Sequence, residues 1–472
     1  MKTRYILVLV LFLLCYILIG GTLPYRKNPE VSEEYKQNFS VKDYYGTEEG
    51  TDRAKIIIDN GEALKERIRL IDQAQDRIVL STFSFAADTS GKQMLAALLE
   101  AADRGVQIQI LADGFNSWIN MEGNPYFINL AKHENVEIKI YNKANLFLPW
   151  KGMSRLHDKC IVADERVYLV GGRNTFDYFL GDQDCYKNYD TDVLVYNTGG
   201  GESSVYEVLE YFDRLWELDC CKLWHDKNIL DNCQPSVRRA DQELRQIYAT
   251  MKKEHPDWFE MMDYETVTVA TKKISLLSGQ TGLYAKEPQV FYGLCALMKE
   301  AKDNITIHTP YVIFNQDMYE MIQKVCDGDA DVYLMTNSAA NNGNPFGSVD
   351  YLLHKEEILA TGLRVSEYEG ERSYHSKCIA IDHHISVIGS FNMDIKSAYQ
   401  DTETMLVIDS EELNGQLRAA MEYYQKSAEP AVLKNGEMEK LFAREVPIAI
   451  RLQRWVIKLL DPYLRFLWYW KL

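Results

Sequence analysis

Positive charge is scarce in this sequence. Its 472 residues include 52 lysines and arginines against 69 aspartates and glutamates, which gives a formal net charge of −17. Proteins that follow nucleic acid usually carry a basic stripe and gain affinity by releasing the counterions of the phosphate backbone. The charge balance therefore argues against a nuclease and against any nucleic-acid partner.

The cysteines lack the spacing of a metal site. Nine cysteines are scattered along the chain, with no repeated C-x-x-C pair and no histidines placed to complete a tetrahedral site. We therefore expect neither a structural nor a catalytic zinc, and we expect no cofactor. The length favours two or three domains over one, because a chain of this size can bury two cores.

Long apolar runs are also rare, and the exception lies at the N-terminus. The segment from Tyr5 to Leu23 is uncharged and mostly apolar, with basic residues on both flanks. Its length is sufficient for a helix to cross a bilayer, although a cleaved secretory signal is the alternative interpretation. We expect 1–25 to form a single-pass membrane anchor, and a chain that enters a membrane in this way usually leaves its bulk outside the cytoplasm.

Most of the remaining chain repeats one β-α-β order. Hydrophobic periodicity predicts the first copy as strand 77–85, helix 91–105, strand 106–114 and strand 136–142. The second copy follows as strand 304–314, helix 317–327, strand 331–338, helix 351–361 and strand 363–370. We expect two α/β domains, at 50–220 and 265–440, joined by a helical connector at 221–264.

Each copy ends in the same motif, H-x-K-x-x-x-x-D, followed by G-[GS]-x-N at one fixed spacing. The matched positions are His157, Lys159, Asp164, Gly172 and Asn174 in the first copy, and His375, Lys377, Asp382, Ser390 and Asn392 in the second. Chance coincidence of so many positions at one spacing, each at the same place in the repeat, is very small. The doubled motif is therefore the strongest functional signal in the sequence.

Strand periodicity assigns roles within the motif, because alternate side chains share a face. In each copy the histidine and lysine share a face, whereas Asp164 and Asp382 fall on the opposite parity at a turn between two strands. The candidate catalytic residues are the two histidines, two lysines and two aspartates, and the aspartates are expected to brace the hairpin. Small and amide side chains at the ends of the returning strands, Gly172, Asn174, Ser390 and Asn392, are candidate phosphate-binding residues.

This residue set fits the chemistry of a phosphate ester. Cationic and amide groups can donate to the phosphate oxygens, while one imidazole attacks phosphorus and the other protonates the leaving oxygen. Histidine suits both tasks because its ordinary pKa lies near neutrality.

The doubled motif resembles the signature of the phospholipase D superfamily, and the resemblance covers about 55–429. The "GGRN" of the first copy and the "GSFNMDIKSAYQDTE" of the second are similar to those of bacterial cardiolipin synthases. The resemblance implies two pseudo-twofold α/β halves, with mixed sheets flanked by helices and one shared active site. It also implies phosphatidyl transfer through a phosphohistidine, with His157 as the nucleophile and His375 as the acid and later the base. By position, Asp192 and Glu403 match the family's acidic residues that orient the histidines.

The C-terminal segment 444–472 reverses the charge of the chain. Four basic residues, Arg451, Arg454, Lys458 and Arg465, fall on one arc of a helical wheel, with apolar residues around the remainder. Pro462 is expected to interrupt the helix, and Trp468, Tyr469 and Trp470 suit the headgroup level of a bilayer. We expect an interfacial helix on an anionic membrane, with packing on the globular body as the alternative.

Three functions remain open at this point. The first is a membrane-associated phosphatidyltransferase that makes cardiolipin from phosphatidylglycerol and a second acceptor, which could be phosphatidylethanolamine or another alcohol. The second is hydrolysis of a phospholipid by water, and the third is a membrane-tethered phosphodiesterase or nuclease. A non-enzymatic protein is disfavoured because both histidine–lysine pairs are intact.

Overall fold

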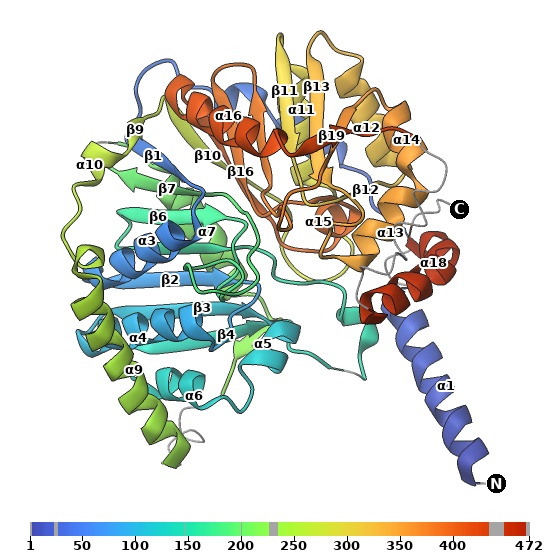
Figure 1. Cartoon of the computed structure of the whole chain (residues 1–472). Helices are drawn as coiled ribbons and strands as arrows, with labels where there is room; N and C mark the ends of the chain where they lie inside the picture. Colours follow the sequence, from blue (N-terminus) through green and yellow to red (C-terminus); the bar gives the residue numbers. More distant parts are fainter. Residues whose placement is uncertain are drawn as a thin grey trace.

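The computed structural model describes residues 2–22, 27–145, 147–199, 201–225, 235–433 and 448–468. Its two large sheets each belong to one half of the chain, the first blue to green and the second yellow to red in Figure 1. Helices flank both sheets. The expected pair of α/β halves with mixed sheets is confirmed.

The first half is built on nine strands. They are β1 (Asp52–Ile57), β2 (Arg77–Thr82), β3 (Gln107–Asp113), β4 (Val136–Tyr141), β5 (Cys160–Ala163), β6 (Val167–Gly171), β7 (Asp192–Asn197), β8 (Cys221–Leu223) and β9 (Val269–Ala270). Their order across the sheet is β9-β1-β7-β6-β5-β2-β3-β4-β8. The connector expected at 221–264 therefore begins with an edge strand of this sheet.

The second half is built on eight strands. They are β10 (Lys273–Ser278), β11 (Asn304–His308), β13 (Asp331–Asn337), β14 (Arg364–Tyr368), β15 (Cys378–Ile381), β16 (Ile385–Gly389), β18 (Thr404–Asp409) and β19 (Ala428–Pro430). Their order is β10-β18-β16-β15-β11-β13-β14-β19. A small parallel pair, β12 (Val312–Ile313) with β17 (Met393–Asp394), lies beside it.

The two sheets repeat one topology. Strand by strand, β1-β7-β6-β5-β2-β3-β4-β8 corresponds to β10-β18-β16-β15-β11-β13-β14-β19. In each half the strands that carry the motif, β5 with β6 and β15 with β16, are antiparallel hairpins, whereas β2-β3-β4 and β11-β13-β14 are parallel. Equivalent residues can therefore be identified by strand register.

Helices cover the outer faces and the connections. In the first half they are α3 (Asn60–Gln73), α4 (Thr89–Asp103), α5 (Gly114–Asn120), α6 (Pro125–Lys132) and α7 (Ser204–Trp216). The connector contributes α9 (Pro235–Glu254), η4 (Pro256–Trp258) and α10 (Tyr264–Val267). In the second half they are α11 (Gln289–Lys299), α12 (Gln316–Cys326), α13 (Pro345–Leu353), α14 (Lys355–Ala360), α15 (Ile395–Tyr399) and α16 (Glu411–Gln425). Two short elements, α2 (Glu33–Asn38) and η2 (Val41–Tyr44), precede β1, and η3 (Pro149–Lys151) precedes β5.

Local sequence explains where several of these elements begin. Asp88 caps α4 by accepting a hydrogen bond from the amide of Gly91, and Asp113 caps α5 at the end of β3 in the same way. The motif strands β6 and β16 are buried along their whole length. Such strands lie between two apolar layers, so they carry continuous apolar runs rather than a polar face.

A common core joins the halves. Val162 and Val170 of the first motif hairpin belong to one apolar cluster with Cys378 and Ile388 of the second. Contacts of β6 and β7 with β16 place the two sheets against each other. The alternate residues Ile161 and Leu169 face the opposite way, into the separate core of the first half. The two motifs are thus held by apolar packing between the halves.

The N-terminal expectation is not supported. The helix α1 (Lys2–Thr22) rests on the segment around η3, where the Tyr16 hydroxyl donates to the carbonyl of Phe147 over 2.9 Å. Within the described ranges, no helix has both the length and the apolarity that crossing a membrane requires. The single-pass anchor expected at 1–25 is therefore wrong, and the extracytoplasmic placement of the body, which depended on it, loses its basis. Residues 23–25 lie outside the described part of the chain.

The C-terminal segment forms one helix, α18 (Ile448–Trp468). It continues past Pro462, so the predicted interruption there is wrong. Arg454, expected on the basic arc of an interfacial helix, is buried and donates to the carbonyl of Ala339 over 2.9 Å. The expected segment 444–472 is described only in part, since 444–447 and 469–472, including Tyr469 and Trp470, lie outside the described residues, as does the side chain of Trp468.

Candidate active site

The two motifs meet where the halves face each other. Leu156, directly before the first motif histidine, forms an isolated bridge with Thr402, and Tyr374, directly before the second, forms one with Tyr189. The amide of His375 donates to the carbonyl of Tyr189 over 2.6 Å. In each case the partner segment comes from the other half.

Each histidine is bound by a carboxylate of the opposite half. Nδ1 of His157 lies 2.8 Å from Oε1 of Glu403, and Nδ1 of His375 lies 2.6 Å from Oδ2 of Asp190. An ionised carboxylate can only accept, so it fixes the proton on Nδ1 and leaves Nε2 as the basic nitrogen of the ring. The pairing is therefore crosswise, and neither half holds a complete histidine–carboxylate pair by itself.

The carboxylate that contacts His375 is Asp190, not Asp192. In the strand register Gly171 pairs with Asp192, and the equivalent Gly389 pairs with Met405. Counting back two residues from each partner makes Asp190 the counterpart of Glu403. Asp192 instead forms buried ion pairs with Arg67 at 2.8 Å and Arg173 at 3.2 Å. The sequence-based assignment failed because it aligned the two acidic segments without the register of their strands.

Gly172 and Arg173, which stand where the second motif has Ser390 and Phe391, both bear on Asp190. A β-carbon added at Gly172 would lie 2.3 Å from Oδ1 and 2.7 Å from Oδ2 of Asp190, so only glycine leaves room for this carboxylate. Arg173 is fully buried and donates to the main-chain carbonyl of Asp190 over 2.6 Å. The Gly-Arg step of "GGRN" thus creates the space for Asp190 and holds its backbone.

The second motif supports its carboxylate differently. The hydroxyl of Ser390 donates to Oε2 of Glu403, and the hydroxyl of Ser397 donates to Oε1 over 2.6 Å. Glu403, whose side chain is one methylene longer than that of Asp190, thus accepts a hydrogen bond from the serine at the position equivalent to Gly172. Gly172 and Asp190 therefore form one matched pair of residue types, and Ser390 and Glu403 form the equivalent pair in the second half.

The motif lysines are buried beside the histidines. In both motifs the lysine Nζ donates to the main-chain carbonyl of its own motif histidine. Burial lowers the pKa of Lys159 to about 7 and that of Lys377 to about 8. Because an anionic ligand favours the ammonium form, a bound phosphate diester would raise both pKa values and draw protons onto the site.

The two histidines differ electrostatically. Burial, followed by the charge of Lys159, holds the pKa of His157 well below its usual range. Burial and Lys377 lower the pKa of His375 to about 4, against the opposing charge of Asp190. Burial raises the pKa of Glu403 to about 7, whereas the charges of Lys377 and His375 outweigh burial and lower the pKa of Asp190. His375 is therefore paired with a firmly ionised carboxylate and His157 with one that titrates near neutrality.

The motif aspartates lie away from the histidines. Asp164 accepts hydrogen bonds from the backbone amides of 75–77, and Asp382 accepts them from those of 302–304. Both adopt positive φ, 50° and 46°, at the tip of the motif hairpin. They tie each hairpin to the start of β2 or β11, which matches the bracing role that strand parity predicts and not direct participation in chemistry.

The motif asparagines have polar atoms to offer. The side-chain oxygens of Asn174 and Asn392 are buried without a hydrogen-bond partner among the described residues. Each oxygen can only accept, so its partner would be a donor such as a ligand hydroxyl, and Nδ2 is the atom of each side chain that could donate to a phosphate oxygen. Two phenylalanines stand edge-on to the histidines: Phe83 lies 4.9 Å from the ring of His157, and Phe179 lies 4.9 Å from that of His375.

Three further buried residues were not found from the sequence. Asp158, between the motif histidine and lysine, accepts hydrogen bonds from Thr402 and Tyr211. Burial raises its pKa to about 6 and that of Asp394 to about 7, whereas burial lowers the pKa of Lys286 to about 8. Of these three residues, only Asp158 could have been noticed in the sequence, because the second motif has Ser376 at the equivalent position.

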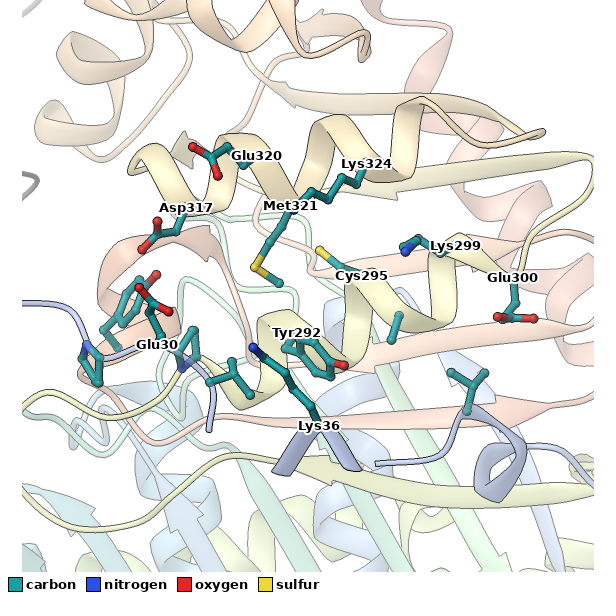
Figure 2. A pocket seen from close by; sticks show the side chains of 16 residues that line it. Glu30, Lys36, Tyr292, Cys295, Lys299, Glu300, Asp317, Glu320, Met321 and Lys324 are labelled. Atoms are coloured by element: carbon teal, nitrogen blue, oxygen red, sulfur yellow. The ribbon is translucent and has the colours of Figure 1, made fainter. Parts of the chain in front are cut away.

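A separate cavity of about 560 Å³ lies between α11, α12 and the N-terminal segment (Figure 2). Cys295 and Met321 form part of its wall, with Lys299 and Lys324 at one end. No motif residue lines it. Within the described ranges, no three histidine, cysteine, aspartate or glutamate side chains come together in a way that could hold a metal ion.

Known proteins are similar to this chain in sequence or in fold. Cardiolipin synthase C of Escherichia coli (strain K12) is 25% identical over 396 residues, covering 75% of this chain and 80% of its own. Cardiolipin synthase 1 of Staphylococcus aureus (strain COL) is 24% identical over 414 residues, covering 86% of this chain and 73% of its own. The crystal structure of phosphatidylserine synthase from Haemophilus influenzae Rd KW20 has the same fold, with a TM-score of 0.59 at 15% identity over 94% of this chain and 98% of that chain.

One family covers both halves. The family described as "Cardiolipin synthase, PLD-like domain" matches residues 67–216 and 294–424, more than half of the chain. Both matched segments contain one complete copy of the doubled motif. The chain therefore belongs to this family and is an enzyme of the phospholipase D superfamily, similar to cardiolipin synthases.

Proposed function

We propose that the protein is a phosphatidyltransferase that makes cardiolipin from phosphatidylglycerol through a phosphohistidine at His157. The observation that carries the proposal is the crosswise pairing of His157 with Glu403 and of His375 with Asp190. Two oriented imidazoles at one interface can act on opposite sides of a single phosphorus atom. The similarity to cardiolipin synthases supports phospholipid as the substrate class.

His157 fits the role of nucleophile. Its lowered pKa keeps the imidazole neutral at physiological pH, so Nε2 retains the lone pair that attacks phosphorus. Glu403 holds the proton on Nδ1 and stabilises the positive charge that the ring acquires when the phosphorus–nitrogen bond forms. Only 9% of His157 is exposed, which limits the access of bulk water.

His375 fits the role of acid and base. Its partner Asp190 stays ionised, and an ionised carboxylate stabilises an imidazolium. A bound phosphate diester adds further negative charge and raises the pKa of His375 from about 4. The imidazolium then protonates the leaving oxygen of the glycerol headgroup, and the resulting neutral ring accepts the proton of the incoming hydroxyl.

The remaining motif residues stabilise the phosphate. Lys159 and Lys377 supply positive charge, and Asn174 and Asn392 supply amide donors to the equatorial oxygens as negative charge develops on them. In sum, two phosphatidylglycerol molecules give cardiolipin and glycerol. The phosphatidyl group moves first to Nε2 of His157 and then to the hydroxyl of the second lipid.

Intact-protein mass spectrometry tests the covalent step. His157→Ala should form no adduct with a p-nitrophenyl phosphatidyl diester, whose leaving group needs no proton. His375→Ala should form the adduct and retain it, because no base remains to activate the acceptor. An adduct on the His157 variant that maps to His375 would reverse the roles, and no adduct on either variant or on wild type would refute the covalent route.

Analysis of lipid products tests the acceptor. Phosphatidylglycerol labelled in its acyl chains should give labelled cardiolipin and unlabelled glycerol. When phosphatidylethanolamine is added, its loss during cardiolipin formation would identify it as a second substrate. Phosphatidic acid as the main product would identify a hydrolase of the phospholipase D type instead. The His157→Ala variant is the matched control in both measurements.

A further inference from the structure

The C-terminal helix α18 is amphipathic, but its apolar face points outward. Ile448, Leu452, Trp455 and Leu459 follow one another at helical spacing and are 77, 64, 53 and 54% exposed. On the other side Arg454 is 2% exposed and hydrogen-bonded to Ala339. A basic residue therefore takes part in holding the helix on the protein, and its apolar stripe has no cover among the described residues.

The attachment lies on the second-half rim of the candidate active site. The helix packs along α13, and Ile457 joins the small apolar cluster of Ala339 and Val349. Ala339 lies in the loop that follows Asn337 at the end of β13. The Asn337 side chain donates to the carbonyl of Tyr374 and accepts from its amide. Tyr374 directly precedes His375, so α18 stands at the edge of the sheet that carries the catalytic histidine.

The first half presents apolar side chains at the equivalent edge. α5 follows β3 directly, and Phe115, Trp118 and Ile119 on it are 44, 53 and 58% exposed. The Phe115 ring lies 5.1 Å from the guanidinium of Arg155, two residues before His157. Exposed apolar side chains therefore flank the active site on α5 in one half and on α18 in the other.

We propose that α5 and α18 form a lipid-docking face that seats the active site against an anionic bilayer. Besides the buried Arg454, the described side chains of α18 include Arg451 and the exposed Lys458 and no acidic residue as far as Leu460, on a chain whose formal net charge is −17. This local reversal fits an anionic surface. Apolar stripes of this kind insert at the boundary between headgroups and acyl chains.

The surrounding surface favours a bilayer over a protein partner. α1 contacts α18 and extends away from it at the edge of the molecule (Figure 1). Many apolar side chains of α1 are exposed, among them those of Leu11 and Phe12. Exposed apolar surface marks an interaction site, and the basic residues of α18 beside it favour an anionic bilayer as the partner. A lipid substrate in the proposed function would enter from the same surface, although the docking face follows from the geometry alone.

Quenching by lipid tests which elements touch the bilayer. The full-length protein is mixed with phosphatidylglycerol–phosphatidylcholine vesicles whose acyl chains carry bromine, and the loss of tryptophan emission is measured. Trp455→Phe and Trp118→Phe should each remove part of the lipid-dependent quenching. Trp258→Phe is the matched control, because Trp258 packs in η4 against α3 and α9, and the quenching should not change.

Vesicle sedimentation gives an independent measure. Leu452→Ser/Leu459→Ser should weaken partition onto these vesicles at least tenfold, whereas Met261→Ser, at a residue 80% exposed on the connector, should not. Both measurements need no turnover, so failure of the proposed transferase activity would leave their outcome intact. Quenching that persists in both the Trp455 and Trp118 variants and resides on Trp150 beside α1 would overturn the proposal. So would a lipid-free dimer that Leu452→Ser/Leu459→Ser dissociates, since a second copy would then cover the face.

Discussion

Replacement of Gly172 by serine, the residue that the second motif carries at the equivalent position, should impair this enzyme. The added β-carbon would lie 2.3 and 2.7 Å from the two oxygens of Asp190. Contacts of a β-carbon below 3.0 Å are essentially never found, so the nearer oxygen must move by at least about 0.7 Å. The same carboxylate makes the 2.6 Å hydrogen bond to His375.

The expected loss follows from that bond. A hydrogen bond to a charged group contributes about 1.5–3 kcal/mol, and each 1.4 kcal/mol corresponds to about tenfold in rate. Gly172→Ser should therefore lower kcat by about 10- to 100-fold through misplacement of His375. Overpacking at this buried site should also cost about 1–3 kcal/mol of folding free energy.

The second motif suggests a compensating change. There the serine hydroxyl donates to the carboxylate of Glu403, whose side chain is one methylene longer than that of Asp190. Gly172→Ser/Asp190→Glu should reproduce that arrangement beside His375 and recover part of the lost activity. Asp190→Glu alone should be impaired, because the glycine leaves the longer side chain without its serine partner.

The assay is kcat for cardiolipin formation from phosphatidylglycerol for the wild type, both single variants and the double variant, with urea denaturation of each. A double variant more active than Gly172→Ser alone would give a favourable coupling energy. Full activity of Gly172→Ser, or strictly additive losses in the double variant, would refute the steric argument. Loss of stability without loss of kcat per folded molecule would confine the effect to packing.

Three other outcomes follow from the site. Asp190→Asn should lower kcat about 100-fold or more with little change in stability, whereas Asp192→Asn should cost about 3–5 kcal/mol of stability by leaving its two buried arginine partners uncompensated, as measured by urea denaturation. Because the pKa values of Lys159 and Lys377 are lowered by burial to about 7 and about 8, kcat/KM for an anionic diester should fall as pH rises through this range, and a profile still rising at pH 9 would contradict the cationic role. Asp382→Ala should cost about 1–3 kcal/mol of folding free energy by releasing backbone amides, with kcat per folded molecule retained.

The sequence was sufficient for the repeat, the two mixed sheets and the superfamily. Apolar residues alternate in β3 and β4 and form a short continuous run in β2, and alternation recurs in β11 and at the start of β14, because strands and amphipathic helices leave distinct periodicities. The turn position of Asp164 and Asp382 also followed from parity alone. These features depend on local order, which the sequence carries directly.

Features that depend on contacts between the two halves could not be predicted from the sequence. The crosswise pairs join residues 246 and 185 positions apart, and no local pattern indicates which half supplies the partner. Asp192 was assigned in place of Asp190 because two acidic residues stand close together, and only the register with Gly171 distinguishes them. The orientation of α18 was likewise hidden, since a helical wheel gives the faces but not which one meets the protein.

The proposed reaction needs two unlike histidines, whereas a duplicated fold supplies two like ones. In this chain the two histidines differ in the residues that surround them. Asp190, made possible by Gly172 and held by Arg173, is firmly ionised and suits an acid, whereas Glu403 titrates near neutrality and suits a histidine that must start neutral. Because each carboxylate comes from the opposite half, a change in one motif alters the histidine of the other. The division of labour between the motifs is thus a property of their interface, and variants at 172, 173 and 190 should affect His375 although they lie in the half that contains His157.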